Sequence, residues 1–173
     1  MTPLELKNKC GVDVRDMHKH HFGGGWVANT ARVDHTAYVG SNAIVLDMVQ
    51  VKDRATIEDY VVLYNSVCVK GSATVKGNAI LSDNVVVKDQ AIVQDNARLS
   101  GDAVVGDNAV IEADASLSGE SLVLNEVVVG GRAIVAWKSR ILGASVIDED
   151  ACITDEAIVC GYDRIGLLGT ING

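Results

Sequence analysis

Proline and aromatic residues are scarce in this chain. Its 173 residues include a single proline, Pro3, and aromatic residues make up 4% although hydrophobic residues make up 48%. Proline removes a backbone hydrogen-bond donor, so its absence after residue 3 leaves the chain free to pair as strands. The apolar side chains are mainly Val, Ile, Leu and Ala, which can fill only a narrow core.

Positive charge, long apolar runs and motif-forming cysteines are also lacking. A net charge of −8 argues against a nucleic-acid partner, because phosphates are bound by basic surfaces. No apolar run approaches the about 20 residues that span a bilayer, and the start shows no secretory pattern, so we expect no membrane partner. The four cysteines have no metal or redox spacing, which favours reduced thiols and a cytoplasmic location.

A six-residue repeat occupies most of the chain. Residues 30–173 divide into 24 consecutive hexads without insertion or deletion. Position four is Val, Ile or Leu in all 24, position two is Ala in 14 and Val in 5, and position six is Asp, Asn or Gly in 18. Such a frame indicates a solenoid in which each repeat packs on its neighbours.

Each repeat position has a physical role. Positions two to five alternate inward and outward, so they predict a short strand. Position four fills the core, position two fits a small side chain near a corner, and position six tolerates a left-handed turn. Three hexads then make a triangular coil of 18 residues. We therefore predict an all-β, single-stranded parallel β-helix of about eight coils, with residues 1–23 as an N-terminal cap segment and 24–173 as the β-helix domain.

The repeat resembles the bacterial hexapeptide-repeat transferase superfamily. That pattern is an aliphatic residue, three residues around a turn, and a small residue, as in Val33–Ala37 and Val75–Ala79. The segment Gly23–Ala28 is also similar to the start of uncharacterised GGGWV-type hexapeptide proteins. The resemblance implies a left-handed coil and a homotrimer. It leaves function open, because the superfamily includes acyltransferases, carbonic anhydrases, nucleotidyltransferase domains and structural proteins.

Outward positions predict an oligomer interface. Residues 18 apart share a face, and two faces carry vertical files of apolar residues that are too extended for a soluble monomer. The alternative is a monomer whose exterior only reflects strand propensity. The third face is also apolar near its start, at Ile44, Leu46, Val62, Tyr64 and Ile80. The predicted interface residues on the first two faces are Val86, Ile92, Val104, Val110, Leu122, Leu124, Val128, Leu142 and Val146.

A basic file and a histidine cluster are the candidate ligand sites. Lys52, Lys70 and Lys88 stack on one face, either relieved by nearby acids or forming a site for a small anion such as the phosphates of a nucleotide or coenzyme A. The histidines are a candidate site for a divalent metal, or alternatively belong to a solvated or packed N-terminal segment. They are His18, His20, His21 and His35.

Catalytic residues are not recognisable in the repeat. Acyltransferases of the superfamily generally use a histidine base, whereas residues 36–173 contain no histidine. We therefore favour a rigid homotrimeric module for binding, display or scaffolding. One alternative is an acyltransferase-like enzyme that uses acyl-coenzyme A at a subunit interface. Another is a polymer-forming structural protein, since no capping helix follows the repeat.

Overall fold

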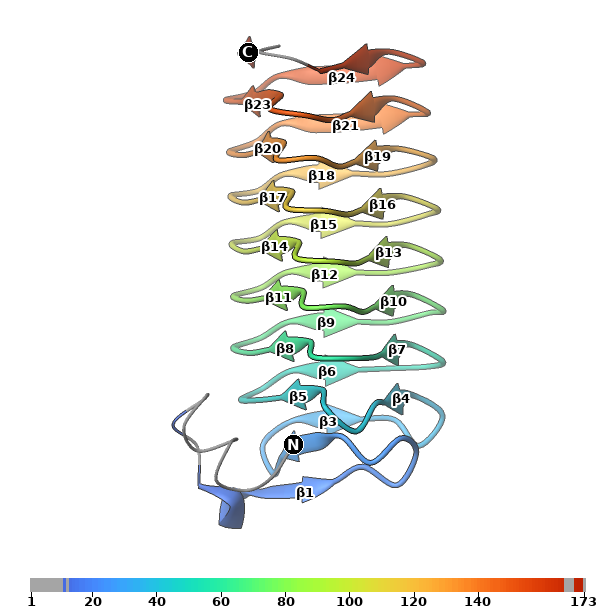
Figure 1. Cartoon of the computed structure of the whole chain (residues 1–173), viewed down its shortest axis with the longest axis vertical. Coiled ribbons are helices and arrows are strands. Elements are labelled where there is room, and N and C mark those ends of the chain that lie inside the picture. The colour runs from blue at the N-terminus through green and yellow to red at the C-terminus, as the bar shows by residue number, and fades with distance from the viewer. Residues whose placement is uncertain (1–10, 12, 167–169, 173) are drawn as a thin grey trace.

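The chain folds into a parallel β-solenoid of about eight coils, confirming the predicted fold class (Figure 1). The computed structural model describes residues 11, 13–166 and 170–172. Of the predicted cap segment 1–23, residues 1–10 and 12 therefore lie outside the described residues. The left hand of the coil stays a prediction.

Three sheets, one on each side of the column, contain the strands. A short 3-10 helix, η1 (Val14–Asp16), precedes them. Sheet I has the order β1 (Met17–Lys19), β2 (Trp26–Ala28), β5 (Ile44–Val45), β8 (Val62–Leu63), β11 (Ile80–Leu81), β14 (Arg98–Leu99), β17 (Ser116–Leu117), β20 (Ile134–Val135), β23 (Cys152–Thr154) and β26 (Thr170–Asn172). Sheet II has the order β3 (Arg32–Val33), β6 (Gln50–Val51), β9 (Cys68–Val69), β12 (Val86–Val87), β15 (Val104–Val105), β18 (Leu122–Val123), β21 (Arg140–Gly143) and β24 (Ile158–Gly161). Sheet III has the order β4 (Tyr38–Val39), β7 (Thr56–Ile57), β10 (Thr74–Val75), β13 (Ile92–Val93), β16 (Val110–Ile111), β19 (Val128–Val129), β22 (Val146–Ile147) and β25 (Arg164–Ile165).

The strand register confirms a coil of 18 residues. Thr74 pairs with Ile92 and Val75 with Val93, and the other parallel pairs keep the same offset. Parallel strands at about 4.8 Å place equivalent residues of successive coils directly above one another. Each outward repeat position therefore forms a vertical file.

The strands are shorter than the sequence predicts. Most span only positions three and four of a hexad, as in Arg32–Val33, instead of positions two to five. The backbone must turn at every sixth residue, and the corners on either side leave room for only two extended residues. Backbone hydrogen bonds nevertheless join successive coils beyond the strands: Arg32 N–H donates to Val49 O and Asp34 N–H to Val51 O, each at 2.9 Å.

Position four and position two form one continuous core, as predicted. Val75, Val93 and Val105 are fully buried, and so are the corner alanines of the same coils. On sheet I the inward file is leucine in four successive coils, at Leu63, Leu81, Leu99 and Leu117. The position-four residues Val33, Ile165 and Ile171 are only partly buried because they lie in the first and last coils.

Carboxylates at position six tie neighbouring coils together. Asp83 has a left-handed backbone, with φ of 61°, and its Oδ2 accepts a hydrogen bond from Gly101 N–H at 3.0 Å. That backbone donor favours the ionised carboxylate, so the pKa of Asp83 lies below its usual value. The same contact recurs one coil apart at other corners, for example from Gly71 N–H to Asp53 at 2.9 Å. Aspartate at this position thus satisfies both the turn and the stacking.

The N-terminal segment covers one apolar surface that the sequence leaves exposed. Ile44 and Leu46 are buried with Met17 of β1, and Val14 and Trp26 pack beside them. Ile44 and Leu46 are therefore covered within the chain, which corrects their reading as part of an exposed subunit contact, whereas Val62 and Tyr64 are half-buried and Ile80 stays exposed. Antiparallel pairing of β1 with β2 holds the segment in place. Among the described residues, no helix has the length and apolar character needed to cross a membrane.

Candidate functional site

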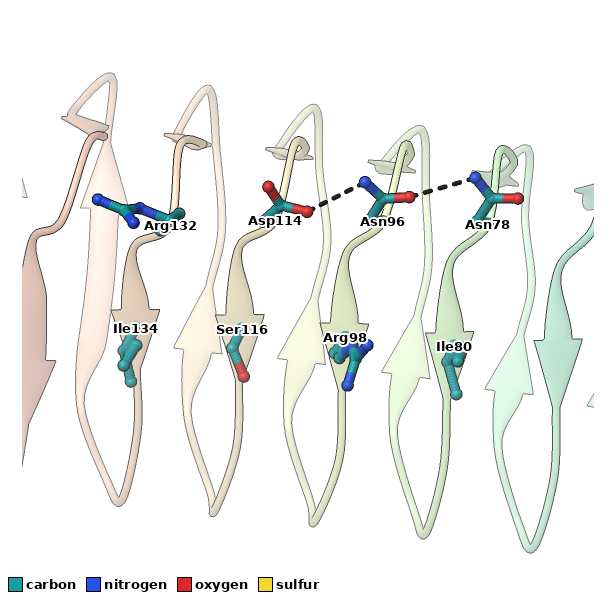
Figure 2. A pocket seen from close by; sticks show the side chains of 8 residues that line it. All are labelled: Asn78, Ile80, Asn96, Arg98, Asp114, Ser116, Arg132 and Ile134. Atoms are coloured by element: carbon teal, nitrogen blue, oxygen red, sulfur yellow. Dashed lines mark hydrogen bonds between the residues drawn. The ribbon is translucent and has the colours of Figure 1, made fainter.

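The groove of sheet I is a shallow, open depression on the outer face of the column (Figure 2). Strands β11, β14, β17 and β20, with the turns before them, line its volume of about 650 Å³. Two vertical files form it, one from repeat position one and one from repeat position three. The lining residues are Asn78, Ile80, Asn96, Arg98, Asp114, Ser116, Arg132 and Ile134.

The position-one file is a ladder of polar side chains. Asn78 Nδ2 donates to Asn96 Oδ1 at 3.2 Å, and Asn96 Nδ2 donates to Asp114 Oδ1 at 3.0 Å (Figure 2). These residues follow the corner turn of three successive coils, where short polar side chains are favoured. The ladder holds its amides in one orientation while all three residues remain exposed to solvent.

The position-three file combines apolar and charged groups. Ile80 is 36% exposed and Ile134 is 46% exposed. Between them lie Arg98, which is exposed, and the shorter Ser116, which is half-buried. Within the part of the chain that the structure describes, Arg98 forms no ion pair. The groove therefore combines a cation, hydrogen-bonding groups and apolar contact surface.

Arg132 is the last residue of the polar file toward the C-terminus. Its Nη2 donates to Asp150 Oδ2 at 2.7 Å, so its orientation is set by the next coil. The groove is not among the sites predicted from the sequence, although Asn78, Asn96 and Asp114 recur every 18 residues at position one. That recurrence is a signal for the polar file, whereas the groove also requires the position-three residues beside it.

The lysine file lies on sheet II, at position five. Lys70 is exposed, whereas Lys52 and Lys88 are half-buried. Lys88 Nζ contacts Asp89 Oδ2 at 2.9 Å. This bond to Lys88 is the main reason that the pKa of Asp89 lies below its usual value, and the more distant charge of Lys70 adds to it. One lysine is thus relieved by an acid, as the alternative to an anion site expects, while anion binding by the file stays a prediction.

The four histidines occupy different environments. His20 is buried, at 6% exposure, with its Nε2 at 3.0 Å from Ala37 O, and its ring centroid lies 4.5 Å from that of His21. His18 Nδ1 lies 3.1 Å from Asn29 Oδ1, and His35 is exposed after β3. Among the described residues, no three His, Cys, Asp or Glu side chains are grouped so that they could hold a metal ion. Metal binding by these histidines stays a prediction.

Burial makes His20 sensitive to pH. Loss of solvent lowers the pKa of His20 below its usual 6.5, and the neighbouring His21 and His18 lower it further, while the bond to Ala37 O opposes them. The folded state thus favours the neutral ring, so the unfolded segment binds more protons below pH 6.5. The contact between the N-terminal segment and the first coil is complete above that pH and weakens below it.

We expect the fluorescence of Trp26 to report this loss. In a Trp137→Phe background, titration from pH 8 to pH 5 should show a transition below about pH 6.5. His20→Gln keeps a side-chain donor but cannot titrate, so its fluorescence should stay constant. The exposed His35→Gln is the matched control and should keep the transition; a transition retained by His20→Gln would contradict the assignment.

The predicted interface residues lie on two sheets and are all half-buried. Val86, Val104 and Leu122 form the position-three file of sheet II, with Leu124 and Leu142 beside it at position five. The file of sheet III contains Ile92, Val110, Val128 and Val146, and the register stacks them in successive coils. The structure thus brings together the residues of each file, while their contact with another copy stays a prediction.

Three of the cysteines lie at outward positions of the repeat. Cys68 and Cys152 are half-buried and Cys160 is exposed, and all three are free thiols. Cys10 lies outside the described residues.

No protein-family model, curated protein or solved structure matches this chain.

Proposed function

We propose that this protein is a rigid homotrimeric module for binding, display or scaffolding, in which sheets II and III form the contact between copies. The observation that carries the proposal is that the outward apolar residues of these two sheets occur in the same coils, and so at the same levels of the column. Each coil from residue 84 to residue 155 contributes an apolar outward residue to sheet II and another to sheet III; in the last of these coils the residue on sheet II is Leu142 at position five, beside the exposed Arg140 at position three. The pairs are Val86 with Ile92, Val104 with Val110, Leu122 with Val128, and Leu142 with Val146.

Equal height matters because of symmetry. Rotation about an axis parallel to the column moves every residue within its own level, so a patch on sheet II can meet only the same levels of sheet III on the next copy. A head-to-tail contact of this kind forms a closed ring when the rotation closes. The apolar residues of the two sheets satisfy that requirement at four consecutive levels, three of them within the position-three files and the fourth through Leu142.

Rigidity suits the module to display and scaffolding. Neighbouring coils are joined by backbone hydrogen bonds at positions one, three and five of most hexads, for example from Met48 N–H to Asn65 O at 2.9 Å. The same coils share an uninterrupted core. A side chain on any outer file is thereby held at a constant position relative to those above and below it.

Light scattering coupled to gel filtration tests the proposal. We expect a molecular mass three times that of the single 18.3 kDa chain, independent of protein concentration. The mass of one chain at all concentrations would contradict the proposal. A mass that grows with concentration, with filaments in electron micrographs, would instead favour the polymer-forming alternative.

The lysine file supports the alternative of an enzyme that uses acyl-coenzyme A. Lys70 is exposed, and its charge is free to meet a phosphate on the outer surface of sheet II. This alternative predicts that coenzyme A binds, and that Lys70→Glu weakens its binding about tenfold or more in isothermal calorimetry. Lys76→Glu is the matched control, because Lys76 has the same repeat position in the same coil but belongs to sheet III. Equal binding by both variants would contradict an anion site at the lysine file.

A further inference from the structure

We propose that the groove of sheet I binds an acidic oligosaccharide, that is, a short chain of sugar units of which at least one carries a carboxylate. The inference deepens the proposed function by naming the ligand of the module. It rests on that function in one respect: contact through sheets II and III leaves sheet I uncovered.

The polar ladder suits hydroxyl groups. Each asparagine amide has two N–H donors and a carbonyl oxygen with two lone pairs, and the bonds from Asn78 to Asn96 and from Asn96 to Asp114 use only part of them. Every rung thus offers a hydrogen-bonding group to the ligand while its orientation is already set. A hydroxyl both donates and accepts, so sugar units can bond to each rung in turn.

Spacing along the ladder also matches a sugar chain. Successive rungs lie one coil apart, at about 4.8 Å. That separation is similar to the length of one pyranose unit in an extended oligosaccharide. Three rungs, Asn78, Asn96 and Asp114, therefore correspond to about three consecutive units.

Arg98 supplies the preference for a carboxylate. It lies midway along the groove, is exposed, and has no ion pair within the described residues. A guanidinium presents N–H donors in a planar fork that matches the two oxygens of a carboxylate. Asp114 is the one acidic residue of the lining, and its Oδ1 already accepts a hydrogen bond from Asn96.

Apolar contact comes from the two isoleucines. Ile80 and Ile134 are exposed on either side of the arginine and the serine in the same file (Figure 2). They offer surface to the C–H groups of a sugar ring, while Ser116 is short and leaves room between Arg98 and Ile134. The floor of the groove therefore accommodates a ring whose edge meets the polar ladder.

An extended acidic peptide fits less well. Strands β11, β14, β17 and β20 each pair with neighbours on both sides, so the groove offers no free strand edge. Peptides that bind as added strands need such an edge for their backbone amides. The groove presents side chains alone, which suits a ligand whose polar groups are hydroxyls and carboxylates.

Isothermal calorimetry on the full-length protein tests the inference with three probes: an α-1,4-linked galacturonic acid tetramer, the uncharged galactose tetramer with the same linkage, and tetra-aspartate. We expect saturable binding of the acidic sugar, about tenfold or more weaker binding of the neutral sugar, and no saturable binding of the peptide. Absence of binding by the acidic sugar, or equal binding of the peptide, would overturn the inference.

Variants localise the binding. Arg98→Gln should weaken binding of the acidic tetramer about tenfold or more. Arg32→Gln is the matched control, an exposed arginine at position three of sheet II, and should leave binding unchanged. Asp114→Asn keeps an oxygen acceptor for Asn96 and removes the negative charge that repels a carboxylate, so it should bind the acidic tetramer more tightly than the wild type. Unchanged binding by Arg98→Gln would overturn the site.

Failure of this inference is distinguishable from failure of the proposed function. The variants Arg98→Gln and Asp114→Asn alter sheet I alone, and both should keep the trimer mass in light scattering. A trimer that binds no oligosaccharide would contradict the ligand assignment only. A monomer that binds the acidic tetramer would contradict the trimer only.

Discussion

Replacing Leu122 by lysine is expected to convert the trimer into monomers. Leu122 is half-buried in the single chain and is the last of three successive apolar residues in the position-three file of sheet II, after Val104 and before Arg140. In the proposed assembly it becomes enclosed against sheet III of the next copy. Burying an unpaired ammonium there costs several kcal/mol at each contact, which raises the dissociation constant by about 100-fold or more.

Analytical ultracentrifugation at several concentrations measures this effect. Ile80→Lys is the matched control, because Ile80 has the same outward repeat position on sheet I and should leave the trimer intact. A trimer that persists in Leu122→Lys, or that is lost equally in Ile80→Lys, would show that sheet II is not the contact.

Charge complementation sharpens the same test. Leu122 and Val128 belong to the same coil, so the proposed rotation brings Leu122 of one copy to the level of Val128 on the next. Val128→Glu alone should also yield monomers. The double variant, with lysine at 122 and glutamate at 128, places opposite charges at one level and should recover part of the association. No recovery would argue against pairing between these two files.

Truncating Leu99 to alanine is expected to have the largest effect on folding stability. Leu99 is 1% exposed and stacks between Leu81 and Leu117 in the inward file of sheet I. The coils above and below it are joined by backbone hydrogen bonds, so they cannot collapse into the space that the side chain leaves. A cavity of this kind lowers the free energy of unfolding by about 2–5 kcal/mol.

Urea denaturation followed by circular dichroism measures the loss. Ile80→Ala removes an aliphatic side chain of similar size from the outward file of the same sheet, and because Ile80 is 36% exposed it should cost less than about 1.5 kcal/mol. Similar losses of unfolding free energy in the two variants would contradict the division into inward and outward files, on which the assignment of residues to each outer surface depends.

The repeat allowed most of the column to be predicted. An uninterrupted hexad frame indicates which side chains enter the core, and the structure confirms this at Val75, Val93 and Val105. It also indicates which residues share a file, as the pairing of Val86 with Val104 shows. The strand length was predicted less well, because alternation alone does not show how much of each side is taken up by the corners.

The candidate site was predicted only in part. The apolar and lysine files follow from the 18-residue spacing, but the groove of sheet I was missed because it combines two repeat positions. It joins a polar position-one file to a position-three file in which the short Ser116 lies between Arg98 and Ile134, a combination that neither file reveals alone.

By itself, the sequence determined the coil length, the inward residues and the composition of each outer file, because a six-residue side gives every side chain one direction. Only the tertiary structure decided that Ile44 and Leu46 are covered and that His20 is buried against Ala37 O. These contacts depend on the path of residues 13–23, which precede the first coil. Without a periodic pattern, their positions follow from long-range packing that the order of residues does not reveal.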